Sequence, residues 1–329
     1  MTDLLSVDDI RRAAQTLDGK ARKTPLLESP LLNQRLGCRL LIKPEMLQVT
    51  GSFKFRGAFN RVSQIPQSDI HHGVVAFSSG NHAQGVALAA QMMGIPARIV
   101  MPGDAPLVKI NNTRAYGAQV VFYDRKTDDR EAICDELARK HGATLIRPYD
   151  DPAIIAGQGT VGLEIADDLR RMGIHANMVL VPCGGGGLVA GTALTMAAES
   201  PETNVYSVEP EDFDDTARSL VAGNRLKNAP HGRSMCDALL SPEPGKLTFG
   251  LNQRLLAGGL AVSDAHVANA MRIAFDDLKL ISEPGGAVAL AAALSGAVKT
   301  DGQTVVAVMS GGNVDAGTFR DVLGAAHLT

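Results

Sequence analysis

The chain has 329 residues, of which 45% are hydrophobic and 20% charged, and its formal net charge is -3. This length can bury a large core and suggests two domains or two closely packed subdomains. The weakly acidic balance provides no basic field for nucleic acid, and no apolar run is long enough to span a membrane. No basic-then-apolar leader is seen, and the four cysteines are scattered, so we expect a cytoplasmic protein with reduced thiols.

The predicted elements alternate between short apolar runs and longer helical patterns. A helix is expected over 7–17, with Ser6 as its N-cap. The apolar runs predict strands near 40–42, 74–77, 97–101, 120–123, 144–146, 178–181, 205–208 and 305–308. Between the strands the patterns predict five helices. One begins near residue 81, one ends near 117 and one ends near 141, and the other two cover 158–172 and 188–198.

Strand followed by helix, repeated, predicts an α/β fold with parallel sheets and helices on both faces. Segment 73–149 contains a full set of such units. We therefore expect a small inserted domain over 71–150 and a large domain made of 1–70 and 151–329. The stretch 223–246 is rich in Gly, Pro and Asn and is expected to form loops over the surface or over the site entrance.

Lys54 lies in the run Gly-Ser-Phe-Lys-Phe-Arg-Gly, between two phenylalanines. Apolar surroundings disfavour the ammonium form of a lysine and make its amine nucleophilic. Such a lysine can form a Schiff base with a carbonyl compound, pyridoxal phosphate (PLP) included. The alternative is a lysine at a helix start whose stem packs on the core.

Four consecutive glycines, 184–187, follow the strand predicted at 178–181 and open the next helix. Glycines let the backbone approach an anion closely, and the helix N-terminus supplies free N–H groups. This arrangement predicts a phosphate cradle. Gly185, Gly187 and Ala190, with Glu209 at the end of the next strand, also match a degenerate dinucleotide-binding pattern, so an NAD-dependent oxidoreductase is an alternative.

Two further polar segments follow predicted strands. The run Ser78-Ser79-Gly80-Asn81-His82 places hydroxyls, an amide and a helix start together, which suits a carboxylate and a ring hydroxyl. The run 310–313, Ser-Gly-Gly-Asn, places a hydroxyl at the carboxyl end of a parallel strand, where α/β sheets bind ligands. A helix cap and a tight turn are the structural alternatives.

Taken together, the Ser-Phe-Lys, Ser-Ser-Gly-Asn-His, tetraglycine and Ser-Gly-Gly-Asn segments resemble the fold-type II PLP enzymes, which are tryptophan synthase β-like. The resemblance is to the serine/threonine dehydratase and serine racemase group and covers nearly the whole chain. It implies two open twisted parallel sheets with helices on both faces, and a homodimer. It also implies roles for individual residues: Lys54 as the covalent link to PLP, Gly184, Gly185, Gly186 and Gly187 around its phosphate, Asn81 at its ring hydroxyl, Ser310 at its ring nitrogen and Phe53 beside the ring.

The resemblance also implies a substrate site and a metal site. The substrate carboxylate is expected at Ser78, Ser79, Asn81 and His82, with Arg130 near the mouth. Ser79 matches the second acid/base of serine racemases, because racemisation needs a proton carrier on each face. A divalent metal, Mg²⁺, is implied at the side chains of Glu209 and Asp215 and the carbonyl of Phe213; a solvated surface turn is the alternative.

Two segments depart from the racemase forms, namely 235–238, Met-Cys-Asp-Ala, and 282–286, Ser-Glu-Pro-Gly-Gly. Both belong to regions that shape the substrate pocket, which argues against racemase specificity. The chain ends at Thr329 without the regulatory domain of biosynthetic threonine dehydratases, so feedback inhibition by isoleucine is not expected.

The sequence therefore predicts a carbon–nitrogen lyase, a PLP-dependent dehydratase that converts a 3-hydroxy amino acid to a 2-oxo acid and ammonia. L-threonine and L-serine are the expected substrates, and Lys54 would take the Cα proton. The alternatives are a serine racemase, a 3-hydroxyaspartate dehydratase, the oxidoreductase named above and a catalytically silent binding protein.

Overall fold

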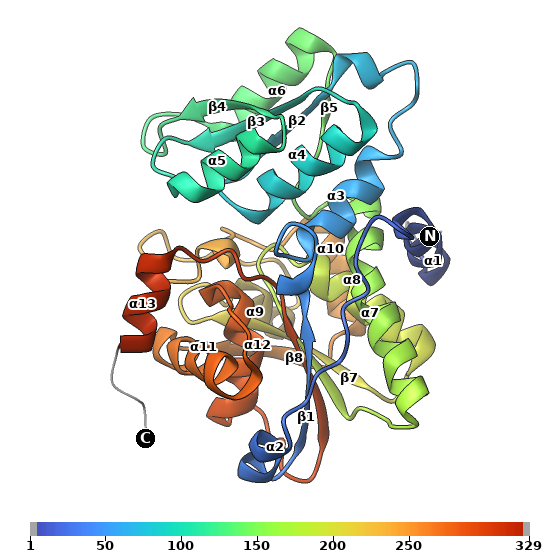
Figure 1. The fold of residues 1–329 in the computed structure, drawn as a ribbon, viewed down its shortest axis with the longest axis vertical. Helices are drawn as coiled ribbons and strands as arrows, with labels where there is room; N and C mark the ends of the chain where they lie inside the picture. Colours follow the sequence, from blue (N-terminus) through green and yellow to red (C-terminus); the bar gives the residue numbers. More distant parts are fainter. Residues whose placement is uncertain (1–4, 325–329) are drawn as a thin grey trace.

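The computed structural model describes residues 5–324, which form two parallel sheets with helices on both faces of each (Figure 1). The larger sheet has the order β1-β9-β6-β7-β8 and the smaller one the order β4-β3-β2-β5. Every strand pair in the two sheets is parallel. The strands are β1 (Arg39–Pro44), β2 (Val74–Phe77), β3 (Ala97–Pro102), β4 (Gln119–Tyr123), β5 (Thr144–Leu145), β6 (Met178–Pro182), β7 (Asn204–Pro210), β8 (Gly258–Val262) and β9 (Thr304–Met309). These sheets confirm the predicted fold class.

The helices connect the strands in the crossover manner that parallel pairing requires. They are α1 (Val7–Leu17), α2 (Pro30–Leu36), α3 (Lys54–Val62), α4 (Asn81–Met93), α5 (Leu107–Ala115), α6 (Arg130–His141), α7 (Pro152–Met172), α8 (Gly187–Glu199), α9 (Asp215–Ala222), α10 (Lys246–Leu255), α11 (Asp264–Leu278), α12 (Pro284–Ser295) and α13 (Ala316–Gly324). Short 3-10 turns occur at η1 (Glu45–Leu47), η2 (Ile70–His72) and η3 (Asp237–Leu239).

Local sequence signals explain several of the boundaries. At α1, Ser6 and Asp9 form a capping box, as the Ser6 signal predicted. By contrast, α7 begins six residues before the expected start at 158. The Oδ1 atom of Asp151 accepts hydrogen bonds from the N–H groups of Ala153 and Ile154, and Pro152 occupies the first turn. This Asp-Pro start signal was missed.

The larger sheet is buried on both faces, so its strands are almost continuously apolar. Strand residues such as Ile42 and Leu180 point toward α11 and α12, whereas neighbours such as Leu41 and Val179 point toward α7 and α8. In this sheet β9 lies between β1 and β6. Because β9 and β6 are neighbouring parallel strands, the segments that follow them lie side by side at the carboxyl ends of the strands.

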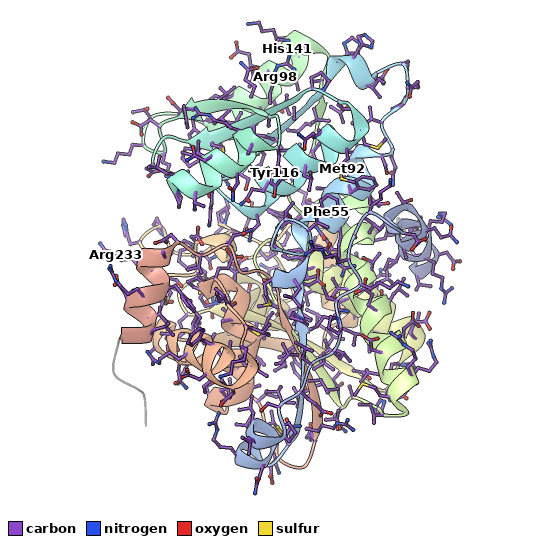
Figure 2. The ribbon with its side chains drawn as sticks, viewed as in Figure 1. Phe55, Met92, Arg98, Tyr116, His141 and Arg233 are labelled. Atoms are coloured by element: carbon purple, nitrogen blue, oxygen red, sulfur yellow. The ribbon has the colours of Figure 1, made fainter. Side chains whose placement is uncertain are left out.

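The smaller sheet packs against α3, α4 and α5 on one face and α6 on the other (Figure 1). Phe55 and Phe59 of α3 belong to the same apolar cluster as Val74 and Ile99 of this sheet. Phe55 is fully buried and lies between the two sheet-containing units (Figure 2). Core packing thus ties α3 to the smaller sheet, and the domain limits at 70 and 150 stay a prediction.

Close backbone contact also joins α3 to α7. A Cβ atom added at Gly157 would lie 2.6 Å from the Cα atom of Gly57 and 2.7 Å from the carbonyl oxygen of Arg56. Only glycine fits this crossing, so α3 is held rigidly where it begins at Lys54. Among the helices that the structure describes, none is both long and apolar enough to cross a bilayer.

Candidate active site

A cavity of about 150 Å³ is lined by residues from both units. The predicted residues that line it come from five separate segments of the chain: Phe53, Lys54, Ser78, Ser79, Asn81, His82, Arg130, Gly184, Gly185, Gly186, Gly187 and Ser310. The fold thus brings together the side chains predicted for cofactor and substrate. The metal-loop residues Glu209, Phe213 and Asp215 do not line this cavity.

Lys54 is the first residue of α3, and its Nζ atom donates a hydrogen bond of 3.0 Å to the carbonyl oxygen of Pro148. Nζ also lies 5.1 Å from the ring centroid of Phe53. Burial lowers the pKa of Lys54 to about 8, although the negative charge of Glu283 acts in the opposite direction. An amine with this pKa is partly neutral near neutral pH and can act as a nucleophile or base.

The glycine loop connects β6 to α8 at the carboxyl end of the larger sheet. Gly186 has a φ of +91°, which L side chains rarely adopt, and Gly185 packs directly against the ring of Tyr149. Within residues 5–324, the N–H groups of Gly184, Gly185 and Gly186 donate to no protein acceptor. Free N–H groups at the start of a helix form a site for a phosphate or another anion.

Segment 78–82 runs from the end of β2 into the first residues of α4, which begins at Asn81, and it lines the same cavity as the glycine loop. The hydroxyl of Ser78 accepts a hydrogen bond of 3.0 Å from the N–H of Gly80, and both Ser78 and Ser79 are half-buried. Asn81 is buried, and its Nδ2 atom donates a short hydrogen bond to Oε1 of Glu283. Its Oδ1 atom accepts a bond of 2.8 Å from Asn313. This double contact orients the Asn81 amide.

His82 is buried one residue further along α4. Its Nε2 atom lies 3.1 Å from the carbonyl oxygen of Ile146, which requires that Nε2 carry the proton. Burial lowers the pKa of His82 to about 3, and the positive charge of Lys54 adds to this, so the ring is neutral. Its Nδ1 atom has no partner among the described residues. The substrate role of His82 stays a prediction.

Ser310 follows β9 and is buried beside the start of α3. Its carbonyl oxygen accepts a hydrogen bond of 3.1 Å from the N–H of Phe53, which joins the end of β9 to the segment that carries Lys54. The hydroxyl of Ser310 has no hydrogen-bond partner in the part of the chain that the structure describes. The side chain is thus available to a ligand in the cavity.

Arg130 begins α6 and lines the cavity; its expected place near the mouth stays a prediction. Its Cζ atom lies 5.0 Å from the ring centroid of Phe77, the last residue of β2. This cation–π contact holds the guanidinium over the strand that leads into the 78–82 loop. The contact is compatible with a role in binding an anionic group.

Glu209 and Asp215, predicted as metal ligands, form a separate buried pair at the end of β7. The Glu209 carboxylate accepts hydrogen bonds from the N–H groups of Thr216 and Ala217, at 3.0 and 2.9 Å. Asp215 accepts a hydrogen bond through Oδ1 from Asn228, and its Oδ2 atom has no partner among the described residues. Burial raises the pKa of both carboxyls, and at Glu209 the charge of Asp215 adds to it.

No described group of three or more His, Cys, Asp and Glu side chains is arranged to hold a metal ion. The predicted set contains only two carboxylates and the carbonyl of Phe213. An unpartnered carboxylate oxygen next to a second buried carboxylate nevertheless fits a cation with oxygen ligands.

The structure argues against the dinucleotide alternative. A ribose-binding acid must lie beside the glycine loop and face its ligand, whereas Glu209 is fully buried and does not line the cavity that the glycine loop lines. The strand order of the larger sheet also differs from the 3-2-1-4-5-6 order of the dinucleotide fold.

Sequence reasoning missed the roles of four residues at this site, Glu283, Tyr149, Lys109 and Asp237. Glu283 is buried beneath Asn81, and burial raises its pKa to about 7. Tyr149 packs on the glycine loop, and Lys109 pairs with Asp237 in the cavity wall. Only the unusual segments at 235–238 and 282–286 provided a signal, and they did not reveal these contacts.

All four cysteines are buried, and none is joined to another by a disulfide. Cys183 precedes the glycine loop, and its Sγ atom lies 3.3 Å from the hydroxyl of Thr216. Burial raises the pKa of the Cys183 thiol well above its usual value, so the thiolate form is disfavoured.

Comparison with known proteins agrees with this geometry. The chain is 43% identical to an L-threo-3-hydroxyaspartate ammonia-lyase from Pseudomonas sp., over 97% of this chain and 99% of the relative. Among solved structures, a threonine deaminase from T.th. is 44% identical with a TM-score of 0.89, covering 94% of this chain and 99% of that one. Maize serine racemase is 35% identical with a TM-score of 0.90, and 96% of each chain is covered.

A family model described as pyridoxal-phosphate dependent enzyme matches residues 17–311, which include Lys54, the glycine loop and Ser310. The match extends over both sheets and all the segments that line the cavity. The chain belongs to the family of pyridoxal-phosphate dependent enzymes.

Proposed function

We propose that the protein is an ammonia-lyase that converts a 3-hydroxy amino acid to a 2-oxo acid and ammonia, with L-threonine and L-serine as substrates. One observation carries the proposal: Lys54, the free N–H groups of the glycine loop and the 78–82 loop all converge on one cavity. The threonine deaminase and the hydroxyaspartate ammonia-lyase named above support the reaction class.

The residues present fit PLP. The N–H groups of Gly184, Gly185 and Gly186 would hold its phosphate, and the unpartnered hydroxyl of Ser310 would meet its ring nitrogen. Asn81 would bond the ring hydroxyl, since its amide is oriented by Glu283 and Asn313. When bound, PLP supplies the electron sink that loosens the Cα proton of the substrate.

The side chains of the cavity would then divide the remaining tasks. Lys54 takes the Cα proton, for which its lowered pKa is suitable. The hydroxyl of Ser78 and the start of α4 bind the substrate carboxylate. Ser310 is a neutral partner, so it does not keep the ring nitrogen protonated as an aspartate would, which favours prompt loss of the 3-hydroxyl group.

A second candidate activity is racemisation, which a specific observation supports. Ser79 lines the cavity beside Ser78, and a hydroxyl there can deliver a proton to the substrate. Maize serine racemase shares the fold and 35% of the sequence. Ser79→Ala should remove any racemisation while it spares elimination from the L-isomer, as judged by chiral chromatography of reactions started from one enantiomer.

We also propose that Mg²⁺ binds at Glu209, Asp215 and the carbonyl of Phe213, supported by the unpartnered Oδ2 atom of Asp215. The ion would offset the repulsion between two buried carboxylates and stabilise the loop between β7 and α9. A homodimer in the cytoplasm completes the proposal. The buried free cysteines support a reducing compartment, and the dimer follows from the family resemblance.

The test is a panel assay on PLP-saturated enzyme with Mg²⁺. L- and D-serine, L-threonine and the 3-hydroxyaspartate isomers are assayed for 2-oxo acid release and for the opposite enantiomer. Oxo acid from serine or threonine, lost in Lys54→Ala, supports the proposal. Activity confined to hydroxyaspartate would move the substrate to the dicarboxylic class, and full activity of Lys54→Ala would refute the assignment of the base.

A further inference from the structure

The cavity contains an ion pair that the proposed reaction does not use. Lys109 on α5 donates a hydrogen bond of 2.9 Å to Oδ2 of Asp237, the first residue of η3. Both residues line the cavity. The Lys109 side chain is 6% exposed and the Asp237 side chain 47% exposed. The pair therefore joins a helix that packs on the smaller sheet to the segment that contains η3, and the cation is the more buried partner.

The Lys109 ammonium lies next to the predicted substrate loop. A Cβ atom added at Gly80 would be 3.4 Å from its Nζ atom. Asp237 is the one hydrogen-bond acceptor of this ammonium among residues 5–324, and an ammonium has three N–H donors. Two donors thus remain for an acceptor within the cavity. The charge of Lys109 also reaches Glu283, whose carboxyl pKa it lowers against the larger effect of burial.

Substrates of the proposed class differ in the group carried by the 3-carbon: hydrogen, methyl or carboxylate. A second carboxylate would be attracted by Lys109 and repelled by Asp237. With both charges present, the wall is close to neutral and suits an uncharged side chain. Without the charge of Asp237, the same wall would present a buried cation with free N–H donors, which is a carboxylate site.

We propose that Asp237 determines specificity in this pocket, since by pairing with Lys109 it disfavours substrates that carry a second carboxylate. The inference rests on the proposed function, because it concerns the side chain of that substrate. Asp237 acts through Lys109 and on the ligand side chain. It takes no part in breaking bonds at Cα.

The test compares two four-carbon ligands on PLP-loaded enzyme by titration calorimetry: succinate, with two carboxylates, and butyrate, with one. Asp237→Asn keeps the size of the side chain and removes its charge. We expect succinate to bind about tenfold more tightly to this variant, because a partly screened charge near the ligand has been removed, and butyrate to bind unchanged. The ratio of kcat/KM for 3-hydroxyaspartate over threonine should rise in parallel.

Lys109→Met provides the opposite change. It should weaken succinate binding relative to butyrate, and the double variant should lose the gain seen in Asp237→Asn. Asp104→Asn is the matched control, because Asp104 pairs with Arg125 outside the cavity and its side chain is 68% exposed. That variant should bind both ligands as the wild type does.

Equal changes in succinate and butyrate affinity would overturn the proposal, since they would show that the pair only holds the two units together. An unchanged affinity for both ligands in Asp237→Asn would also overturn it. Asp237→Ser gives a second uncharged variant at this half-exposed position if the first fails to fold. The calorimetric comparison needs no turnover, so a wild type that is inactive on the whole substrate panel refutes the proposed function separately.

Discussion

Arg56 lies two residues after Lys54 and is the centre of a buried ionic network. Its guanidinium contacts Glu45 at 2.7 Å and Glu164 at 2.6 Å, and Lys43 contacts Glu164 at 2.7 Å. The side chains of Arg56, Glu45 and Lys43 are at most 1% exposed. Two positive and two negative charges thus offset one another; three of these side chains are shielded from bulk water, and that of Glu164 is 15% exposed.

Arg56→Met removes one of the two positive charges, so that Glu164 keeps its pair with Lys43 and Glu45 has no cation paired with it among the described residues. Glu45 would retain only the hydroxyl of Thr24, 2.6 Å from its Oε1 atom. Breaking a buried pair on one side leaves an uncompensated charge, so we expect the free energy of unfolding to fall by about 3–5 kcal/mol. Arg56→Met/Glu45→Gln removes one charge of each sign and should recover about half of that loss.

Urea unfolding of the PLP-free enzyme, followed by far-UV circular dichroism, measures these differences without the contribution of ligand binding. Dichroism is the natural signal because the chain has no tryptophan. Arg320→Met is the control, since the Arg320–Asp321 pair is 78% and 70% exposed, and it should leave stability unchanged. A loss below about 1 kcal/mol in Arg56→Met, the range of surface pairs, would refute the reasoning.

Three further predictions concern titrating groups. Because burial lowers the pKa of Lys54 to about 8, the rate at which PLP-free enzyme captures PLP should rise with pH and level off above pH 8. Visible absorbance measures this rate. A rate that continues to rise well above pH 8 would contradict the prediction. Burial raises the pKa of Glu283 from 4.5 to about 7, so its contribution to stability is lost as pH rises through that range. Denaturation at several pH values should show that the free energy of unfolding of Glu283→Gln rises relative to that of the wild type over this pH interval. A difference between the two that stays constant with pH would argue against the prediction. Mg²⁺ should raise the melting temperature more as pH rises, because burial raises the pKa of Asp215 and the metal binds only the deprotonated carboxylate. This increase in melting temperature should vanish in Asp215→Asn and persist in the control Glu211→Gln, since Glu211 is exposed. Equal gains in both variants would exclude the site.

Much of the fold could be predicted because buried parallel strands are short runs of Val and Ile bounded by turn residues. Strand β2 occupies the predicted residues, β6 is longer than predicted by one residue at its end, and β9 is longer by one residue at each end. Strand β8 was missed, since its sequence Gly-Gly-Leu-Ala-Val is weak in strand signals and most of it is only half-buried at a sheet edge. Helix α12 was also missed because it is buried all round and shows no amphipathic period.

The sequence alone determined the chemistry-bearing loops, because each is a local pattern at a junction between a strand and a helix. Lys54 between phenylalanines, the glycine run and the 310–313 segment each specify a backbone or side-chain property without reference to the rest of the chain. These patterns also sufficed to predict a PLP enzyme.

Tertiary structure alone decided which distant side chains meet around those loops. Asn81 bonds Glu283, and Lys109 bonds Asp237, across 202 and 128 residues of chain. Strand order places β9 beside β6 and so sets Ser310 near the glycine loop, and no local pattern encodes that order. The charge that a substrate meets in the cavity is a sum over these long-range pairs, and for that reason its side-chain preference depends on the packed structure.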